Sequence, residues 1–484
     1  MMLAFLLVGQ SLMDLSTAER FRRDRASEEL ALSAVQQFKS EAARVRNQPG
    51  YWLARFRRPV FPDGGQRLGG TVEVTFDAER AYHSVDNSDS EKPAVGYFDR
   101  GTGKKSVPPF GASLVMKVNA GGAPVYYEAL LQRTWPYVLA TGSRIHLNQQ
   151  LGCPPSRISG HVLMLPDSGP ALPIVLPQTL FELAARTYNT LLRQLPGREE
   201  VAINSACSFE GDVRYYNRTV PPQAVALAGP PPGVWNGRVQ QDPEPGDFQE
   251  ALQFPDFSRA TVPPSTTGYT VPQPGVSLVR VLHPQPLMVI ARELELADGD
   301  FFIPEDTTNV LPAPLPIDQR IKAGISLKNA RLYVKGDLIL DAFRNDEGQL
   351  HVPGITGENS TLIVEGNLLL RDGTLDAGEQ GMVIHCKNLF LGAHGDFRGL
   401  FLMQGSAIIR PQNSAGQPLR LRGALVCASG RLEVTREPLP GDLEVSGETV
   451  DCIDMASTEL TYDARYARSM QKYGNWQLIS LRRL

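Results

Sequence analysis

The sequence predicts a mainly β protein: a β-solenoid (β-helix) preceded by an N-terminal α-helix and a small antiparallel β unit. Three observations support this prediction. A short repeat of alternating apolar residues lies between Gly324 and Val434, a single long helical pattern lies near the N-terminus, and Gly and Pro occur along the whole chain. With 44 Gly and 38 Pro among 484 residues, strands and turns are favoured over helices.

The repeat consists of five segments that share one register. Their central residues are 30, 21, 18 and 18 positions apart. A unit of this length holds two or three short strands, as in solenoids whose coils stack on one another. The segments are Leu332–Leu340, Leu362–Leu370, Val383–Leu391, Phe401–Ile409 and Leu419–Cys427, centred on Gly336, Gly366, Lys387, Gly405 and Gly423.

Alternate positions of the repeat predict which side chains face inward. Apolar residues recur with a period of two, which indicates strands. A Gly followed by Asp or Asn suits a corner, where a short polar side chain can bond to the backbone. The predicted inward columns are Leu332/Leu362/Val383/Phe401/Leu419 and Leu338/Leu368/Leu389/Ala407/Leu425, and the predicted outward column is Lys335/Glu365/Cys386/Gln404/Arg422.

This pattern resembles the right-handed, Val- and Gly-rich solenoids of the bactofilin, or polymer-forming, kind. The resemblance covers less than a third of the chain and implies no catalytic residue.

Charge and cysteine content exclude several classes of function. The 48 basic and 52 acidic residues nearly balance, so no basic surface for nucleic acid is predicted. The five Cys form neither a CxxC pair nor a metal-ligand cluster. The register places Cys427 inward and Cys386 at the surface. Two of the remaining three could form a disulfide, or all could be unpaired: Cys153, Cys207 and Cys452.

The N-terminus begins with an apolar stretch, Met1–Leu15, that is shorter than the roughly 20 residues needed to cross a bilayer. It continues into an amphipathic helix that Pro49 and Gly50 end. We expect this helix to anchor the protein in a membrane or in a filament core, through a seam formed by Phe21, Val35, Phe38 and Val45. The alternative is a helix packed on its own domain.

An apolar start that runs into Ala18–Ala31 resembles type IV pilins, in particular the N-terminal region of PilX-type minor pilins and pilus-assembly proteins. Pilins also carry a basic leader, a processing Gly and often a Glu five residues into the mature helix, and none of these is visible here. The resemblance therefore implies either a start codon upstream of Met1 or anchoring without processing.

The middle of the chain alternates between predicted strands and inserts. We expect a hairpin between Ser113–Val118 and Val125–Leu131, a long surface loop over His83–Lys105, and a first solenoid coil from Trp135 to Met164. That coil is followed by inserts, namely a helix at Gln178–Leu192 and a Pro-rich stretch over Val220–Pro286.

After Val434 the repeat is expected to end. A turn of helix near Tyr462–Tyr466 and a closing strand at Trp476–Leu481 should cover the open end of the solenoid. This tail resembles those of PilX-type proteins. The predicted domains are 1–50 (helical anchor), 51–135 (antiparallel β unit), 136–320 (first coil with insertions), 321–450 (solenoid repeats) and 451–484 (C-terminal cap).

No catalytic, cofactor-binding or metal-ligating residue is predicted, because the sequence contains no phosphate loop, HExxH, GxSxG or paired Cys–His spacing. The register places His385 inward, as a hydrogen-bonded core or edge residue. One acidic group could bind calcium or act as an acid/base pair on a solenoid face, although turns favour Asp for local reasons. It comprises Asp337, Asp341, Asp372, Asp376, Glu379 and Asp396.

These features together predict a non-enzymatic assembly protein, a minor pilin-like component of a type IV pilus or related envelope machine. Expected partners are other pilin-like proteins and the membrane, both contacted through the N-terminal helix, with self-association of the solenoid as a further contact. The expected location is the bacterial cell envelope, inner-membrane anchored or pilus-associated, with the β domains outside the cytoplasm. The alternative is a surface protein that binds or cleaves polysaccharide on the same scaffold.

Overall fold

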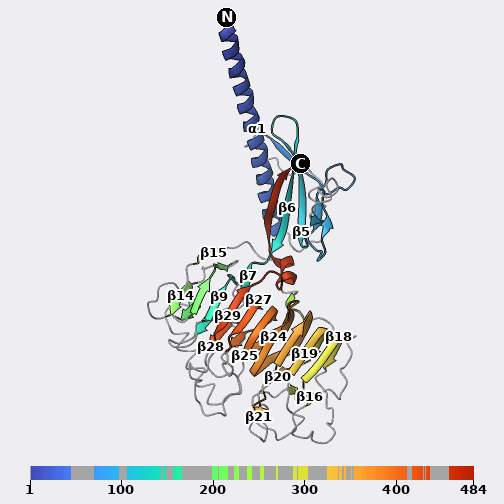
Figure 1. Cartoon of the computed structure of the whole chain (residues 1–484), viewed down its shortest axis with the longest axis vertical. Helices are drawn as coiled ribbons and strands as arrows, with labels where there is room; N and C mark the ends of the chain where they lie inside the picture. Colours follow the sequence, from blue (N-terminus) through green and yellow to red (C-terminus); the bar gives the residue numbers. More distant parts are fainter. Residues whose placement is uncertain are drawn as a thin grey trace. The chain divides into compact units, whose positions relative to one another are not determined.

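The structure is a computed structural model, and it is mainly β with one long N-terminal helix (Figure 1). The chain divides into two compact units. The first comprises Met1–Trp135, Pro243–Phe248 and Ser469–Leu484, and the second comprises Pro136–Asp242 and Gln249–Arg468. The described residues are 2–44, 70–97, 106–142, 145–148, 156–165, 199–204, 207–215, 223–227, 237–241, 251–254, 269–270, 287–290, 293–303, 324–335, 337–340, 343–344, 350–351, 354–410, 417–428, 430, 432–435 and 457–484.

Helix α1 (Met2–Arg44) is one continuous helix of 43 residues. Ion pairs one turn apart support its exposed surface, as between Arg25 and Glu29 (3.2 Å). Its second half packs on the sheet of the first unit through five buried side chains: Leu30, Ala31, Ala34, Val35 and Phe38. No helix in the described residues is both long enough and apolar enough to cross a membrane.

The first unit is built on an antiparallel sheet in the order β1–β5–β6–β30, with β2 paired to β5. The predicted hairpin is confirmed, because β5 and β6 pair from Gly111↔Gln132 to Val118↔Val125. One face of this sheet packs against α1, and the Phe38 and Trp476 rings meet edge to face at 5.8 Å. The strands of this unit are β1 (Thr71–Val74), β2 (Val85–Asn87), β3 (Ala94–Val95), β4 (Ser106–Val107), β5 (Gly111–Asn119), β6 (Val125–Thr134) and β30 (Asn475–Arg483).

The stretch predicted as a long surface loop is ordered where the structure describes it. Ser84 accepts a hydrogen bond from the backbone N–H of Val115 on β5 (2.9 Å), and the Asn87 amide donates to the Lys92 and Pro108 carbonyls (both 2.9 Å). The prediction overlooked these polar side chains because they bond to backbone, which hydrophobic periodicity does not report.

Strand β30 differs from its predicted role. It pairs antiparallel with β6, from Asn475↔Thr134 to Arg483↔Tyr127, and thereby completes the sheet of the first unit. The 3-10 helix η5 (Arg468–Tyr473) precedes it. The tail was expected to close the solenoid, but the alternating residues of a strand do not reveal which sheet it joins.

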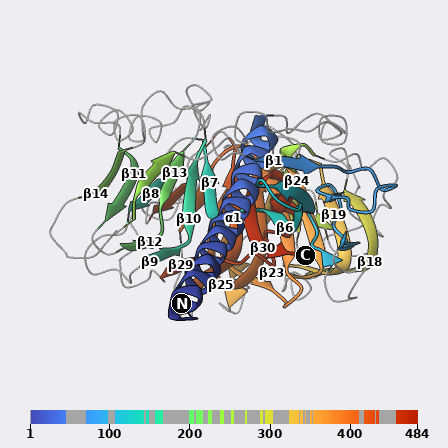
Figure 2. The same ribbon diagram turned by 90° about the horizontal axis from the view of Figure 1, so that it is seen from above.

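The second unit is a stack of parallel strands (Figures 1 and 2). Its N-terminal strands are β7 (Tyr137–Thr141), β8 (Ile145–Asn148), β9 (Ser156–Ser159), β10 (His161–Met164), β11 (Glu199–Asn204), β12 (Cys207–Glu210), β13 (Val213–Tyr215), β14 (Gln223–Leu227) and β15 (Val239–Gln241). Its later strands are β16 (Tyr269–Thr270), β17 (Leu287–Ile290), β18 (Glu293–Ile303), β19 (Gly324–Val334), β20 (Asp337–Leu340), β21 (Phe343–Arg344), β22 (Leu350–His351), β23 (Gly354–Glu358), β24 (Ser360–Ala377), β25 (Met382–Met403), β26 (Ala407–Ile409), β27 (Leu419–Cys427), β28 (Leu432–Thr435) and β29 (Thr458–Tyr462).

Parallel pairing joins the strands around β27 into three ladders, whereas β16 pairs antiparallel with β17 and β21 pairs antiparallel with β22. One ladder contains β27, β29, β9 and β12, a second contains β27, β7, β10, β13 and β15, and a third contains β26, β28, β8, β11 and β14. Strand β29 lies in the first ladder between β27 and β9, so the repeat does not end at Val434 as predicted. Strands β29 and β7 both pair with β27, and β8 pairs with β28, so segments from distant parts of the sequence lie side by side.

One predicted column is confirmed over four positions: Leu338, Leu368, Leu389 and Ala407 pair in succession. The next member of this column is Leu432, whereas Leu425 pairs with Phe401 and Leu139 in another ladder. All four predicted leucines are nevertheless buried in one core: Leu338, Leu368, Leu389 and Leu425.

The other predicted column is wrong from its third member. Leu362 pairs with Ile384, and Val383 pairs with Thr361. The corner between Val364 and Asn367 is one residue longer than the corner between Cys386 and Asn388, and this shifts the register by one. A shift of one residue exchanges the two faces of a strand. Cys386 is therefore inward and fully buried, contrary to the prediction, and Cys427 is inward as predicted.

Asn and Asp residues occupy corners, where the backbone bends between strand segments. Asp298, Asn329 and Asn359 have positive φ angles (51°, 48° and 48°), a conformation that Asn and Asp tolerate better than most residues. Their side chains form a ladder, in which the Asn359 amide donates to Asn329 (3.0 Å) and the Asn329 amide donates to Asp298 (3.2 Å). At another corner, Asn388 donates to Asn367 (2.8 Å).

We expect Leu368→Asp to destabilise the second unit by more than about 4 kcal/mol, because it would bury an unpaired charge between Leu338 and Leu389. The matched control is Lys387→Asp, since Lys387 is exposed on the adjacent strand. Thermal unfolding followed by circular dichroism measures both. Equal melting temperatures for the two variants would contradict the register.

Candidate functional site

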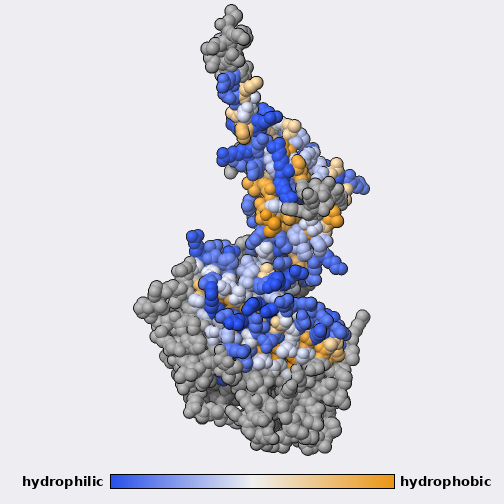
Figure 3. All heavy atoms as spheres, viewed as in Figure 1, coloured by the Kyte–Doolittle hydropathy of each residue, from blue (hydrophilic) through white to orange (hydrophobic). Residues whose placement is uncertain are grey.

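The described part of α1 that precedes the sheet is exposed. Its apolar side chains Met13, Leu15 and Phe21 are 73%, 62% and 72% exposed. Figure 3 shows hydrophilic side chains gathered around the same part of the helix. This part of α1 is therefore available for contact with another molecule.

One face of α1 changes from mostly polar to apolar along its length. Residues 13, 20, 24, 27, 31, 35 and 38 recur at steps of three, four and seven, so they share a face. From Ala31 onward this face is apolar and packs on the sheet. At the boundary Ser27 is hydrogen-bonded to Tyr127 (3.0 Å) and Asp24 forms an ion pair with Arg483 (3.0 Å).

Before this boundary, the same face lines a groove of about 680 Å³. The opposite wall is the turn between β5 and β6, together with the end of β30. Gly121 has a φ of +80°, and space is open around it. The residues lining the groove are Ser16, Thr17, Glu19, Arg20, Arg23, Asp24 and Ser27 from α1, Ala120, Gly122, Ala123, Pro124 and Val125 from the turn, and Arg483.

The groove carries an excess of positive charge, with three arginines and two carboxylates. Asp24 pairs with Arg483 at 3.0 Å, and Glu19 lies 3.6 Å from Arg23 with both side chains about 60% exposed. Such an exposed pair is weak. Within the described residues Arg20 forms no ion pair, so it supplies the excess charge.

The residues predicted to form one seam along α1 lie in different environments. Val35 and Phe38 are buried against the helix's own sheet, and Phe21 is exposed. Val45 and the side chains of Leu6, Leu7 and Leu12 lie outside the described residues. The alternative of a helix packed on its own domain therefore holds for the second half of α1. Sequence periodicity could not separate the two halves, because the apolar pattern does not show where the sheet ends.

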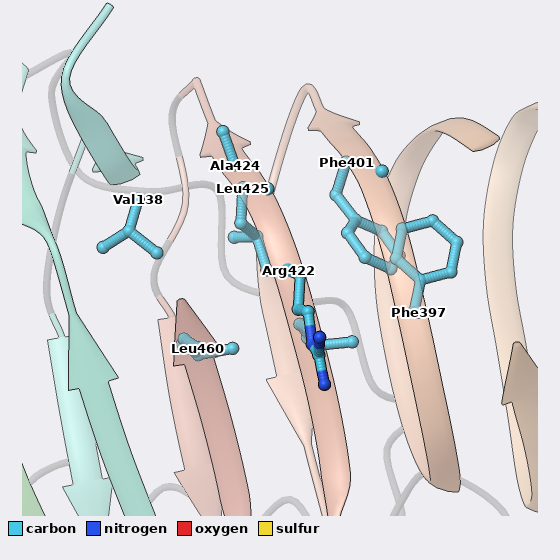
Figure 4. Close-up of a pocket in the computed structure, with 10 residues that line it drawn as sticks. Val138, Phe397, Phe401, Arg422, Ala424, Leu425 and Leu460 are labelled. Carbon is cyan, nitrogen blue, oxygen red and sulfur yellow. The ribbon is translucent and has the colours of Figure 1, made fainter. Parts of the chain in front are cut away.

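A small, partly open cavity of about 10 Å³ lies in the second unit (Figure 4). Its walls are mostly apolar, including Val138, Phe397, Phe401 and Leu460. This volume is close to that of a single water molecule. The cavity is therefore a packing defect and is too small for an organic ligand.

In the part of the chain that is described, two members of the predicted acidic group, Asp376 and Asp396, lie side by side, and both are engaged in hydrogen bonds or ion pairs. Asp376 accepts a hydrogen bond from the backbone N–H of Asp396 (2.9 Å), and Asp396 pairs with Arg398 (3.3 Å) and Arg422 (3.1 Å). Glu379 contributes its carbonyl to the Tyr466 hydroxyl (3.0 Å). Asp341 and the side chains of Asp337 and Asp372 lie outside the described residues, within which no group of three metal-ligating side chains occurs.

Other outward charges pair between neighbouring strands. Arg420 contacts Glu459 (3.1 Å), and Arg157 forms a two-pronged bond to Glu210 (2.6 and 2.7 Å). Because Arg420, Glu459 and Arg157 are successive partners in one ladder, opposite charges alternate along it. These charges favour the observed register.

His385 faces outward between the inward residues Ile384 and Cys386, which corrects its predicted inward position. It is covered by a short segment in which Phe254 stacks on its ring (4.5 Å) and the Leu252 carbonyl accepts from its Nε2 (3.1 Å). The predicted hydrogen-bonded role is therefore confirmed. Burial lowers the pKa of His385 to about 4, although the bond to Leu252 opposes this shift.

No family model matches the chain, and no curated protein matches it. Among solved structures, the competence-associated pilin ComZ from Thermus thermophilus is similar over 78% of this chain and 81% of that chain. The sequence identity is 10% and the TM-score is 0.22. At this TM-score the likeness carries no argument about the fold or function of the chain.

The second unit should lose stability as the pH falls from about 6.5 toward 4. His385 has a lower pKa when folded than the ordinary 6.5, so the unfolded chain binds a proton in this window and the folded chain does not. At pH 5 the loss is about 2 kcal/mol. Melting temperatures at pH 7.5 and pH 5 measure it, with His385→Gln as the comparison. An equal decrease for both proteins would contradict the assignment.

Proposed function

We propose that this chain is a non-enzymatic structural protein, a minor pilin-like component of a type IV pilus or related cell-envelope machine. The observation that carries the proposal is the division of α1. Its second half packs on the first unit, and its first half exposes Met13, Leu15 and Phe21. A helix held at one end and apolar at the other is suited to join a membrane or a bundle of similar helices.

In this proposal the second unit is a right-handed β-solenoid of the bactofilin-like kind. The three parallel ladders and the stacked asparagine corners favour this interpretation. Repeated coils make a stiff body whose surface can contact partners, including a second copy of the chain. Because the N-terminal region resembles PilX-type proteins, we propose that the second unit lies outside the cytoplasm and that the chain is attached through α1.

The proposed partners are other pilin-like proteins and the membrane, contacted through α1, with no role for nucleic acid. The rival function, binding or cleavage of polysaccharide, would need carboxylates that converge in a cleft. The described carboxylates Asp396, Glu459 and Glu210 are instead paired with arginines. This pairing favours the structural role.

Deletion of the gene is expected to reduce surface pili and motility, and complementation with the wild-type chain should restore both. Phe21→Asp should fail to restore them, because it replaces an exposed apolar side chain on the first half of α1 with a charge. Leu484→Asp is the control, since Leu484 is also exposed (41%) but lies at the other end of the chain. Pilus counts by electron microscopy measure the effect.

Normal piliation in the deletion strain would contradict the proposal, as would cleavage of a polysaccharide by the purified chain. Val35→Asp is a poor probe of assembly, because Val35 is fully buried against the sheet and its replacement would disrupt the first unit itself.

Removal of residues 1–20 is expected to move the protein from the membrane fraction to the soluble fraction with its β units intact. Within that segment, the hydrogen bonds of Ser16 and Thr17 go to the Met13 carbonyl in the same helix. Fractionation and circular dichroism test this expectation. A truncated chain that stays with the membrane would show that α1 is not the anchor.

A further inference from the structure

We propose that the groove between α1 and the β5–β6 turn binds the phosphodiester headgroup of an anionic membrane lipid, with Arg20 as the residue that contacts the phosphate. This inference rests on the part of the proposed function that places the start of α1 at a membrane.

Charged side chains are unevenly distributed along α1. Residues 1–18 contain one charged side chain, Asp14, whereas the next seven residues contain four arginines and two carboxylates, Glu19 and Asp24. Met13 and Leu15 are exposed just before this change. An apolar segment followed by clustered cations matches the boundary between the hydrocarbon and the headgroups of a membrane.

The arginines of α1 are also spread around the helix axis. Each residue of an α-helix is rotated by 100° from the last. Four arginines within six positions therefore point to different sides: Arg20, Arg22, Arg23 and Arg25. All four are exposed. A docking face for a single protein would place them on one side, whereas a layer of headgroups surrounds the helix.

The charges within the groove do not balance. Arg483 is paired with Asp24 and Arg23 lies near Glu19, which leaves one positive charge, that of Arg20. A phosphodiester carries one negative charge, and guanidinium groups bind phosphate oxygens in a forked geometry.

The shape of the groove allows a headgroup to enter. Its volume of about 680 Å³ is within the usual range for small-ligand sites. The wall formed by the β5–β6 turn includes three small residues, Ala120, Gly122 and Ala123, and Gly122 lies beside the Arg23 guanidinium. A free phosphate has the same chemistry, but a lipid is favoured because the groove adjoins the exposed apolar part of α1.

The test uses the full chain and vesicle flotation. Vesicles of phosphatidylcholine alone are compared with vesicles that also contain phosphatidylglycerol. The proteins are the wild type, Arg20→Gln, and Arg465→Gln as a matched control, because Arg465 is exposed on the second unit and pairs with Asp463. Circular dichroism verifies that all three are folded.

We expect the wild type to bind the anionic vesicles more tightly, and added salt to weaken this preference. Arg20→Gln should bind them about fivefold more weakly, and Arg465→Gln should bind like the wild type. Equal binding by Arg20→Gln and the wild type would overturn the inference while leaving membrane anchoring intact. Absence of vesicle binding by the wild type would count against the anchor as well.

A separate arm uses inorganic phosphate without vesicles. If phosphate raised the melting temperature of the wild type but not of Arg20→Gln, and vesicle binding did not depend on Arg20, the groove would be a site for a free anion. That result would overturn the lipid assignment. No stabilisation by phosphate, together with Arg20-dependent binding to anionic vesicles, supports it.

Discussion

Parallel pairing between neighbouring strands is the constraint on which the second unit depends. A strand within a ladder pairs its backbone N–H and C=O groups with the strands on both sides, so paired residues of neighbouring strands lie side by side. Inward positions must then be apolar in every strand of a ladder, as Leu338, Leu368 and Leu389 are. Outward positions must avoid like charges, and Arg420, Glu459 and Arg157 alternate accordingly. The same rule lets Asn329 and Asn359 bond to each other at a corner.

Helix α1 is constrained in a different way, because its second half is buried against a sheet and the described part of its first half is exposed. Val35 and Phe38 belong to the core of the first unit, and removing them from water stabilises the sheet and the helix together. Met13 and Leu15 contribute nothing to that core. The charged stretch between these two parts separates them, and the ion pair from Asp24 to Arg483 lies where the helix leaves the sheet.

Much of this architecture follows from the sequence. The helix, the hairpin and the leucine column were predictable because each has a strong local period. The register beyond Leu362 was not predictable. A corner that is one residue longer or shorter exchanges the two faces of the next strand, and no local sequence pattern shows this change. The groove could not be predicted from the sequence either. Arg20 lies in an evident charged run, but Arg483 is more than four hundred residues away in the chain, and only the pairing of β30 with β6 brings it to α1.

The placement of β29 bears on how the chain can reach its native state. A ribosome completes β7, β8 and β9 long before β27, β28 and β29, which flank them in the finished stack. Until those later strands exist, one side of β7 and β8 presents unpaired peptide groups, the kind of open edge that promotes aggregation. Contacts between residues about three hundred positions apart also raise the contact order, and such topologies fold slowly. Completion of the stack therefore depends on the last part of the chain, so a nascent or C-terminally shortened protein would expose an incomplete sheet.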